Sequence, residues 1–244
     1  MNQAIHWEST SGGPRSAARV LVVAAHPDDE VLGCAGTIAR HVAAGDQVHV
    51  LVLGEGVTSR YARRDTKQAE AELDTLRKQI YRAAETLGAA SVHPFGLPDN
   101  RFDSVDLLDI VKIVEDVCGN VEPTIVYTHH GGDLNIDHRL TFEAVLTACR
   151  PYPGQGVKTL YSFEVPSSTE WRAPTAAGAF LPTVYVDISE TLSKKLDAMA
   201  VYEGEVRDFP HHRSTQALEI IARGNGVEVG LEAAERFCLI RTLL

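Results

Sequence analysis

Apolar runs alternate with segments of helical periodicity through the first 150 residues of the chain. Residues 20–25 (VLVVAA) and 47–54 (QVHVLVLG) are nearly continuous apolar runs, which is typical of strands buried on both faces of a parallel sheet. Between them, Val31, Ile38 and Val42 mark one face of a helix over about 30–44, and Gly45 with Asp46 ends it. The pattern predicts a strand, a helix and a second strand in parallel.

The same alternation continues along the rest of the chain. We expect helices over about 66–87, 105–117 and 137–150, and strands over 91–95 and 124–129. The last third predicts strands over 159–165 and 183–188, helices over 189–202 and 214–223, and a final apolar segment over 237–244. Strands that alternate with helices imply right-handed crossovers. The sequence therefore predicts an α/β fold with a mostly parallel central sheet, in which the C-terminal third forms a cap and helps to wall a pocket.

We interpret residues 19–244 as one domain and residues 1–18 as a flexible leader, because STSGGPRS has the composition of a linker. The formal net charge of −10, from 33 acidic and 23 basic residues, argues against a nucleic-acid partner, which would need a clustered basic surface. One short basic cluster (Arg60, Arg63 and Arg64) is either a solvated surface or a contact for a small anion.

Targeting signals and cysteine spacing bear on where the protein works. The four cysteines are far apart and include no C-x-x-C pair, so they predict neither a zinc knuckle nor a disulfide framework. No apolar run reaches the roughly 18 residues of a membrane span, and the N-terminus lacks the order of a signal peptide. We expect a cytoplasmic protein without a membrane span, and the sequence leaves open whether it forms a homo-oligomer.

Two polar clusters follow predicted strands, and both belong at the edge where doubly wound sheets bind ligands. The first cluster contains His26, Asp28, Asp29 and Glu30, and the second contains His129, His130, Asp133, Asp137 and His138. If the two strands are neighbours, the clusters face each other across a crevice. Each cluster alone could be structural, with hydrogen-bonded histidines and acids that cap a helix, but the two together favour a metal site.

A catalytic zinc takes three nitrogen or carboxylate ligands and keeps one position open for water. His26 and Asp29 can supply two ligands from the first loop, and His138 is the first choice for the third. Asp28 then stands beside the metal without binding it, where its carboxylate can accept a proton from water. The sequence predicts metal-assisted hydrolysis.

Three stretches carry a resemblance to a known family. AHPDDEVLGCAGTIARH, LGAASVHPFGLPDNR and VYTHHGGDLNIDHR are similar to the motifs of the PIG-L/LmbE-like zinc-dependent N-deacetylases, and the resemblance covers most of the chain from residue 20 onward. It implies a Rossmann-like three-layer sandwich and one Zn²⁺ per chain, held by His26, Asp29 and His138. It also implies that Asp28 is the general base and that the reaction is hydrolysis of an acetamide on an amino sugar. We expect a sugar of the N-acetylglucosamine type, free or with a glycosidic, nucleotide or lipid extension.

The chain departs from this family in two places. Many members have a histidine at the position of Asn135. Asparagine can donate a hydrogen bond to an oxyanion, but it cannot shuttle a proton. Proton delivery to the leaving amine then falls to Asp28, which would return its proton, or to His129 or His130. Members also often carry an arginine and a glutamate where this chain has Leu76 and Gln79.

Other polar residues are candidates for binding the substrate. Asp99 and Arg101 in LPDNR, Arg213 and Arg60 suit a hydroxyl-rich ligand, although LPDNR could also be a turn without a function. Two rival functions stay open at this point. One is an amidase that acts on a thiol–sugar conjugate, and the other is a non-catalytic module that binds a sugar or a nucleotide.

Overall fold

The computed structural model describes residues 16–173, 175–176 and 178–244, so the predicted leader lies outside the described residues except for 16–18. The strands form one sheet in the order β3-β2-β1-β4-β5-β7-β6. The first five of these are parallel neighbours, and β7 runs antiparallel to both β5 and β6. The seven strands are β1 (Arg19–Ala24), β2 (Gln47–Gly54), β3 (Ser91–Leu97), β4 (Ile125–His129), β5 (Thr159–Phe163), β6 (Val184–Asp187) and β7 (Ala234–Thr242).

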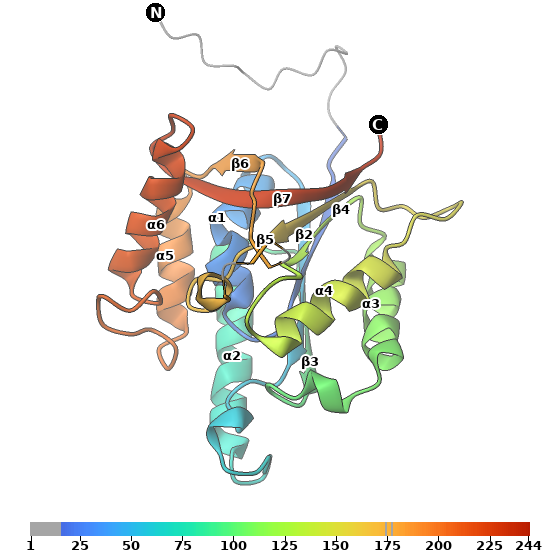
Figure 1. The fold of residues 1–244 in the computed structure, drawn as a ribbon, viewed down its shortest axis with the longest axis vertical. Helices are drawn as coiled ribbons and strands as arrows, with labels where there is room; N and C mark the ends of the chain where they lie inside the picture. The colour runs from blue at the N-terminus through green and yellow to red at the C-terminus, as the bar shows by residue number, and fades with distance from the viewer. Residues whose placement is uncertain (1–15, 174, 177) are drawn as a thin grey trace, which may run out of the picture.

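Helices cover both faces of this sheet and complete an α/β/α sandwich (Figure 1). Side chains of α1, α2, α5 and α6 join one apolar cluster with alternate residues of β1 and β2, and side chains of α3 and α4 join the other. The continuous apolar strands are therefore buried on both faces, as predicted. The helices are α1 (Asp29–Ala43), α2 (Glu70–Leu87), α3 (Leu107–Val121), α4 (Ile136–Ala148), α5 (Leu192–Val201) and α6 (Thr215–Val227), with 3₁₀ turns η1 (Thr58–Arg60), η2 (Phe102–Ser104) and η3 (Thr169–Trp171).

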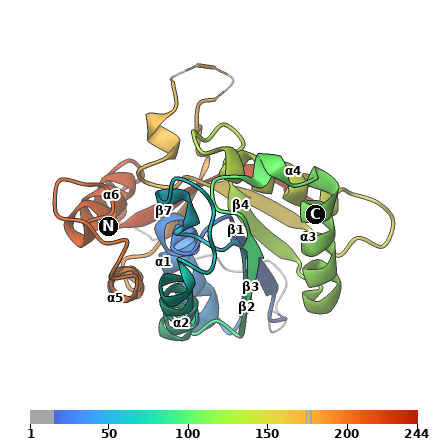
Figure 2. The same ribbon diagram turned by 90° about the horizontal axis from the view of Figure 1, so that it is seen from below.

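The C-terminal third does more than cap the sheet. Strands β6 and β7 extend the sheet beyond β5, while α5 and α6 lie on the side of α1 and α2, away from α3 and α4 (Figure 2). The long helix α2 begins at Glu70 and not near residue 66, because the carboxylate of Asp65 accepts the backbone N–H groups of Lys67 and Gln68 and holds a turn there.

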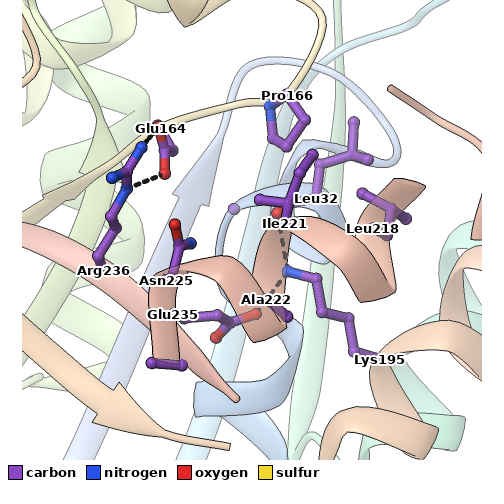
Figure 3. A pocket seen from close by; sticks show the side chains of 12 residues that line it. Leu32, Glu164, Pro166, Lys195, Leu218, Ile221, Ala222, Asn225, Glu235 and Arg236 are labelled. Atoms are coloured by element: carbon purple, nitrogen blue, oxygen red, sulfur yellow. Dashed lines mark hydrogen bonds and ion pairs between the residues drawn. The ribbon is translucent and has the colours of Figure 1, made fainter. Parts of the chain in front are cut away.

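Helix α1 is interrupted near its middle by Cys34, whose φ of −152° is not helical. The break leaves backbone groups without helical partners, and a buried ion pair from the C-terminal third satisfies them (Figure 3). Glu235 accepts the N–H groups of Gly36 and Thr37 at 3.0 and 2.7 Å. Lys195 donates to the carbonyl of Leu32 at 2.9 Å and to Glu235 at 2.6 Å. This pair therefore holds the two halves of α1 together across the break at Cys34.

Removing one partner of this pair should destabilise the fold strongly. Lys195 is 4% exposed, so Lys195→Met leaves the Glu235 carboxylate buried without its cation, at an expected cost of about 3–5 kcal/mol in the free energy of unfolding. Lys194→Met is the matched control on the exposed face of α5 and should change stability by less than about 0.5 kcal/mol. Urea titrations of the three proteins measure both values. Equal stability of the Lys195 variant and the wild type would contradict this account.

The glycines of GCAG bring α1 close to the sheet. A Cβ atom at Gly33 would lie 2.3 Å from the ring of Phe163 in β5, and one at Gly36 would lie 2.8 Å from Ile188. The two glycines thus allow α1 to pack closely against the sheet.

Candidate metal centre and cavity

The two polar clusters lie side by side because β1 and β4 are parallel neighbours, with Val22 paired to Tyr127. The loop after β1 carries His26 to Asp28 and leads into α1, and the loop after β4 leads to His138 in the first turn of α4. Loops after β2 and β3 end at the same edge of the sheet. The predicted crevice is therefore built from the carboxyl ends of the four parallel strands β1 to β4.

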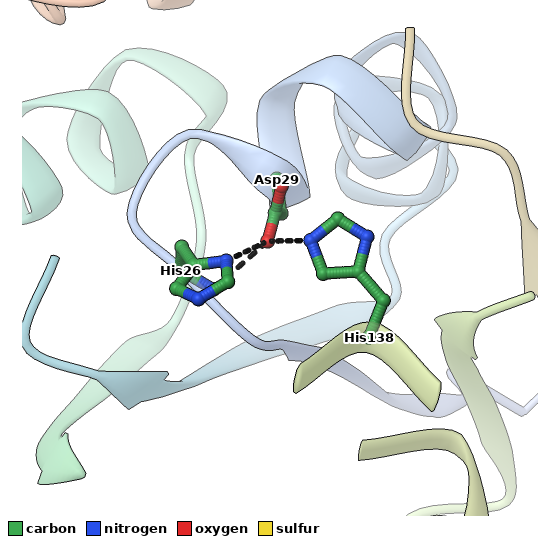
Figure 4. Close-up of side chains that lie close together, drawn as sticks. All are labelled: His26, Asp29 and His138. Carbon is green, nitrogen blue, oxygen red and sulfur yellow. Dashed lines mark hydrogen bonds and ion pairs between the residues drawn. The ribbon is translucent and has the colours of Figure 1, made fainter. Parts of the chain in front are cut away.

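The three predicted ligands converge on one point (Figure 4). The Oδ2 atom of Asp29 lies 3.3 Å from Nδ1 of His26 and 3.2 Å from Nε2 of His138. One donor atom from each residue lies within 4.8 Å of the others. Two imidazoles and a carboxylate at this spacing are a donor set that suits zinc or a similar divalent ion.

A second carboxylate orients His26 from behind. Asp137 Oδ2 lies 2.9 Å from Nε2 of His26, and its Oδ1 accepts the backbone N–H of Phe102. A proton held on Nε2 by this contact leaves Nδ1 free to bind a metal beside Asp29. His26 also lies near Asp99, whose Oδ1 is 3.5 Å from Nε2.

Asp133 does the same for His138. Its Oδ1 lies 3.1 Å from Nδ1 of His138, and the hydroxyl groups of Ser168 and Thr169 donate to its two oxygens. The Nε2 atom of His138 therefore faces Asp29 as the free donor. Carboxylates that fix the tautomer of both histidines are usual around bound metals, so the residues present fit the group that the sequence implies.

The electrostatics of this cluster favour a cation. Burial opposes the charge on His138, yet Asp29 and Asp133 raise its pKa to about 9. Burial likewise opposes the charge on Asp29, but His138 and His129 hold the pKa of that carboxyl well below its usual range. The negative surroundings that stabilise an imidazolium here would also stabilise a metal ion.

Asp28 diverges from Asp29 because its backbone is left-handed, with a φ of 99°. Its N–H donates to Oε2 of Glu30, and Glu30 in turn accepts the hydroxyl of Tyr202 at 2.6 Å. The side chain is 2% exposed, and its Oδ2 lies 2.9 Å from Nη1 of Arg213. Burial raises the pKa of Asp28 well above its usual range, although Arg213 acts in the opposite direction. A raised pKa suits a group that must accept a proton.

A cavity of about 150 Å³ opens in front of these groups. Its wall combines the first loop, the ends of β2 and β3, the start of α4 and two loops of the C-terminal third. The lining residues are His26, Pro27, Asp28, Gly56, Val57, Ser59, Arg60, Leu76, Asp99, Asn100, Asn135, His138, Ser167, Ser168, Glu205 and Arg213.

Three of the four predicted substrate contacts, Asp99, Arg60 and Arg213, line this cavity. Arg101 does not belong to the wall and is exposed. Asp99 accepts the backbone N–H of Ser59 and so ties the loop after β3 to the turn that carries Arg60.

The two further histidine candidates lie outside the cavity wall. His129 is fully buried behind His138, with the two rings stacked at 4.0 Å, and its Nε2 accepts the backbone N–H of Ala25 at 2.8 Å. His130 points toward the loop after η3, where its ring lies 3.2 Å from the carbonyl of Gly178 and packs against Phe180.

Sequence reasoning missed several residues of the wall. Glu205, Ser167 and Ser168 reach the cavity from loops of the C-terminal third, outside all three motif stretches. No motif surrounds them, and only their place in the fold identifies them. Leu76 of α2 lies in the wall. This chain therefore has an apolar side chain in the cavity at a position where family members often have a charged one.

A family model and several known proteins match this chain. Residues 21–149, slightly more than half of the chain, match the PIG-L family model, which is described as GlcNAc-PI de-N-acetylase. The chain belongs to the PIG-L family. The matched segment includes both polar clusters and all three candidate metal ligands.

Two relatives of this PIG-L protein extend the comparison. It is 27% identical over 176 residues to the uncharacterized deacetylase YaiS of Escherichia coli, covering 70% of this chain and 82% of that one. It is also 27% identical over 268 residues to the 1D-myo-inositol 2-acetamido-2-deoxy-alpha-D-glucopyranoside deacetylase of Mycolicibacterium smegmatis, covering 91% and 90% of the two chains.

Solved structures share the fold. The N,N'-diacetylchitobiose deacetylase of Pyrococcus horikoshii superposes with a TM-score of 0.71 at 19% identity, over 93% of this chain and 85% of that one. The 4-carboxy-2-hydroxymuconate hydratase GalB of Pseudomonas putida superposes with a TM-score of 0.72 at 27% identity, over 92% and 97%. Within the described residues, no helix has the length and apolar character to cross a bilayer.

Proposed function

We propose that this PIG-L protein is a zinc-dependent hydrolase that removes the acetyl group from an N-acetylated amino sugar of the N-acetylglucosamine type and releases acetate. The observation that carries the proposal is the donor set of His26, Asp29 and His138, because its two histidines line a cavity that also receives Asp28. Relatives named as deacetylases of acetamido sugars support the choice of reaction.

In this proposal, each residue has a separate task. His26, Asp29 and His138 would hold a divalent ion, which when bound polarises the acetyl carbonyl and makes water more acidic. Asp28 accepts the proton of the attacking water, since its carboxylate faces the cavity without belonging to the donor set. Arg213 keeps that carboxylate in place through the contact at 2.9 Å.

Asp28 also returns the proton to the departing amine. His129 has no exposed surface and uses Nε2 to accept a backbone hydrogen bond, while His130 turns toward Gly178. Neither arrangement favours proton transfer into the cavity. One carboxylate can take the proton from water and then give it to the amine, so no further acid is needed.

Asn135 is proposed to donate a hydrogen bond to the oxyanion of the tetrahedral intermediate. Its Oδ1 caps α4 by accepting the N–H of Asp137, and its Nδ2 donates one hydrogen to Asn100 and carries a second. Asn135→Ala should lower kcat roughly 100-fold with little change in KM, because the bond forms mainly in the transition state. Asn135→His should be tolerated, since a neutral imidazole can donate the same bond.

Asn135→Ser separates this task from helix capping, because serine is a good N-cap residue without an amide donor. The serine variant should therefore lose as much turnover as the alanine variant while its thermal unfolding stays close to that of the wild type. Full activity in Asn135→Ala would refute the oxyanion task.

Acetate release from a panel of N-acetylated sugars tests the proposed function. N-acetylglucosamine, its methyl glycoside, N,N'-diacetylchitobiose and a thiol–sugar amide should be incubated with the wild type, with Asp28→Asn and with chelator-treated protein. We expect acetate from at least one N-acetyl sugar in the first case only. Binding of these sugars without any release would favour the non-catalytic module, and turnover of the thiol conjugate alone would favour the amidase.

A second candidate is hydration of an unsaturated carboxylate, which the similarity to GalB raises. The favouring observation is Asn135, because addition of water to a double bond requires no protonation of a leaving amine. The same assay distinguishes the two: a hydratase consumes the absorbance of a conjugated dienoate and releases no acetate.

A further inference from the structure

The charged groups of the cavity wall are joined in one chain, and Glu205 is its centre. Oε1 of Glu205 accepts a hydrogen bond from Nη2 of Arg60, and Oε2 lies 3.1 Å from Nη1 of Arg213. The same Nη1 lies 2.9 Å from Oδ2 of Asp28. Both guanidinium groups that line the cavity therefore already have a carboxylate partner.

We propose that Glu205 determines substrate specificity by neutralising Arg60 and Arg213, so that the cavity accepts a neutral, hydroxyl-rich sugar and rejects one that carries a phosphate or carboxylate next to the acetamido ring. This inference rests on the proposed deacetylase function and adds the substrate class. Glu205 is 7% exposed and the side chain of Arg213 is 24% exposed, so water screens this contact weakly. The side chain of Arg60 is 46% exposed, so water screens its contact with Glu205 more strongly.

The charge balance of the wall supports this specificity. Apart from the candidate metal ligands, the wall carries the carboxyl groups of Asp28, Asp99 and Glu205 against the guanidinium groups of Arg60 and Arg213. Arg207 lies 4.0 Å from Glu205 but donates to the carbonyl groups of Gly204 and Val206 and is not part of the wall. An anionic group would have to displace a carboxylate from its arginine or lie near Asp99, and both cost free energy.

The remaining polar groups of the wall suit hydroxyl groups. Ser59, Ser167, Asn100 and Asn135 are neutral and can donate or accept hydrogen bonds at the cavity. Ser167 already accepts a hydrogen bond from Nε of Arg213 at 2.9 Å, which fixes the guanidinium plane against the wall. Sugar hydroxyl groups need such mixed partners and no net charge.

Two sugars of similar size test the inference on the metal-loaded full-length protein. They are methyl 2-acetamido-2-deoxy-α-D-glucopyranoside, which is neutral, and N-acetyl-α-D-glucosamine 1-phosphate, which is an anion. We expect the wild type to favour the neutral sugar in kcat/KM by at least about tenfold. Glu205→Gln should reduce this ratio about tenfold or more, because both arginines lose a carboxylate partner. The ratio cancels any effect on turnover that is common to both sugars.

Glu164→Gln is the matched control, because Glu164 also pairs with an arginine, Arg236, but lies outside the cavity wall. It should leave the ratio unchanged. The inference would be overturned if the wild type preferred the sugar phosphate, or if Glu205→Gln left the ratio of the two kcat/KM values unchanged. In either case, acetate release would still support the deacetylase function. If no N-acetyl sugar of the panel yields acetate, the proposed function fails. The inference is then tested by calorimetry, which measures the affinity for each of the two sugars. The wild type should bind the neutral sugar more tightly, and Glu205→Gln should lose this preference.

Discussion

Asp28→Asn should lower acetate release by about 100-fold or more and leave the metal content of the protein unchanged. The variant keeps the size of the side chain and can keep a contact with Arg213, but the amide cannot accept the proton of the attacking water. Because Asp28 lies outside the donor set that includes Asp29, its charge is not required to hold the ion. Steady-state kinetics and metal analysis of the same preparation measure both effects.

Asp29→Asn is the matched comparison for Asp28→Asn, because it separates a metal ligand from a general base. Its Oδ2 is the atom shared by His26 and His138, so the asparagine variant should lose metal as well as activity. If Asp28→Asn lost the metal and Asp29→Asn kept it, the tasks of the two aspartates would have to be exchanged.

The second large effect is expected at the histidine ligands. His26→Ala and His138→Ala each remove one of three protein donors, so purified protein should fall from about one divalent ion per chain to a small fraction of that value. Their activity should fall with the metal. His130→Ala is the matched control for metal content, because its ring contacts Gly178 and lies away from the donor set. Unchanged metal content in both ligand variants would show that the ion is held elsewhere.

The meeting of the three candidate ligands at one edge of the sheet was predictable because local patterns determine it. Continuous apolar strands imply a parallel sheet, and the polar residues after β1 and β4 meet because these strands are neighbours. The spacing of His26, Asp28 and Asp29 also indicated separate tasks for the two aspartates. The two side chains diverge, however, because the backbone of Asp28 is left-handed. Such a conformation is uncommon for residues other than glycine, so the sequence does not reveal it.

Contacts between distant parts of the chain could not be predicted in this way. Glu205 reaches the cavity from the loop between α5 and α6, and Lys195 and Glu235 satisfy the break in α1 from α5 and β7. Each is a single charged residue without a surrounding motif, and one of its partners lies roughly 145 to 200 residues away, as the contacts with Arg60, Leu32 and Gly36 illustrate. Their importance follows from burial and pairing, which only the fold determines.

Stepwise return of metal to the chelated protein tests the central claim most directly, namely that this PIG-L protein hydrolyses an acetamide with an ion held by His26, Asp29 and His138. Metal-free protein should release no acetate from N-acetylglucosamine or its methyl glycoside, and activity should rise linearly with added Zn²⁺ until about one equivalent per chain. Full activity in protein shown by metal analysis to be metal-free would contradict the account.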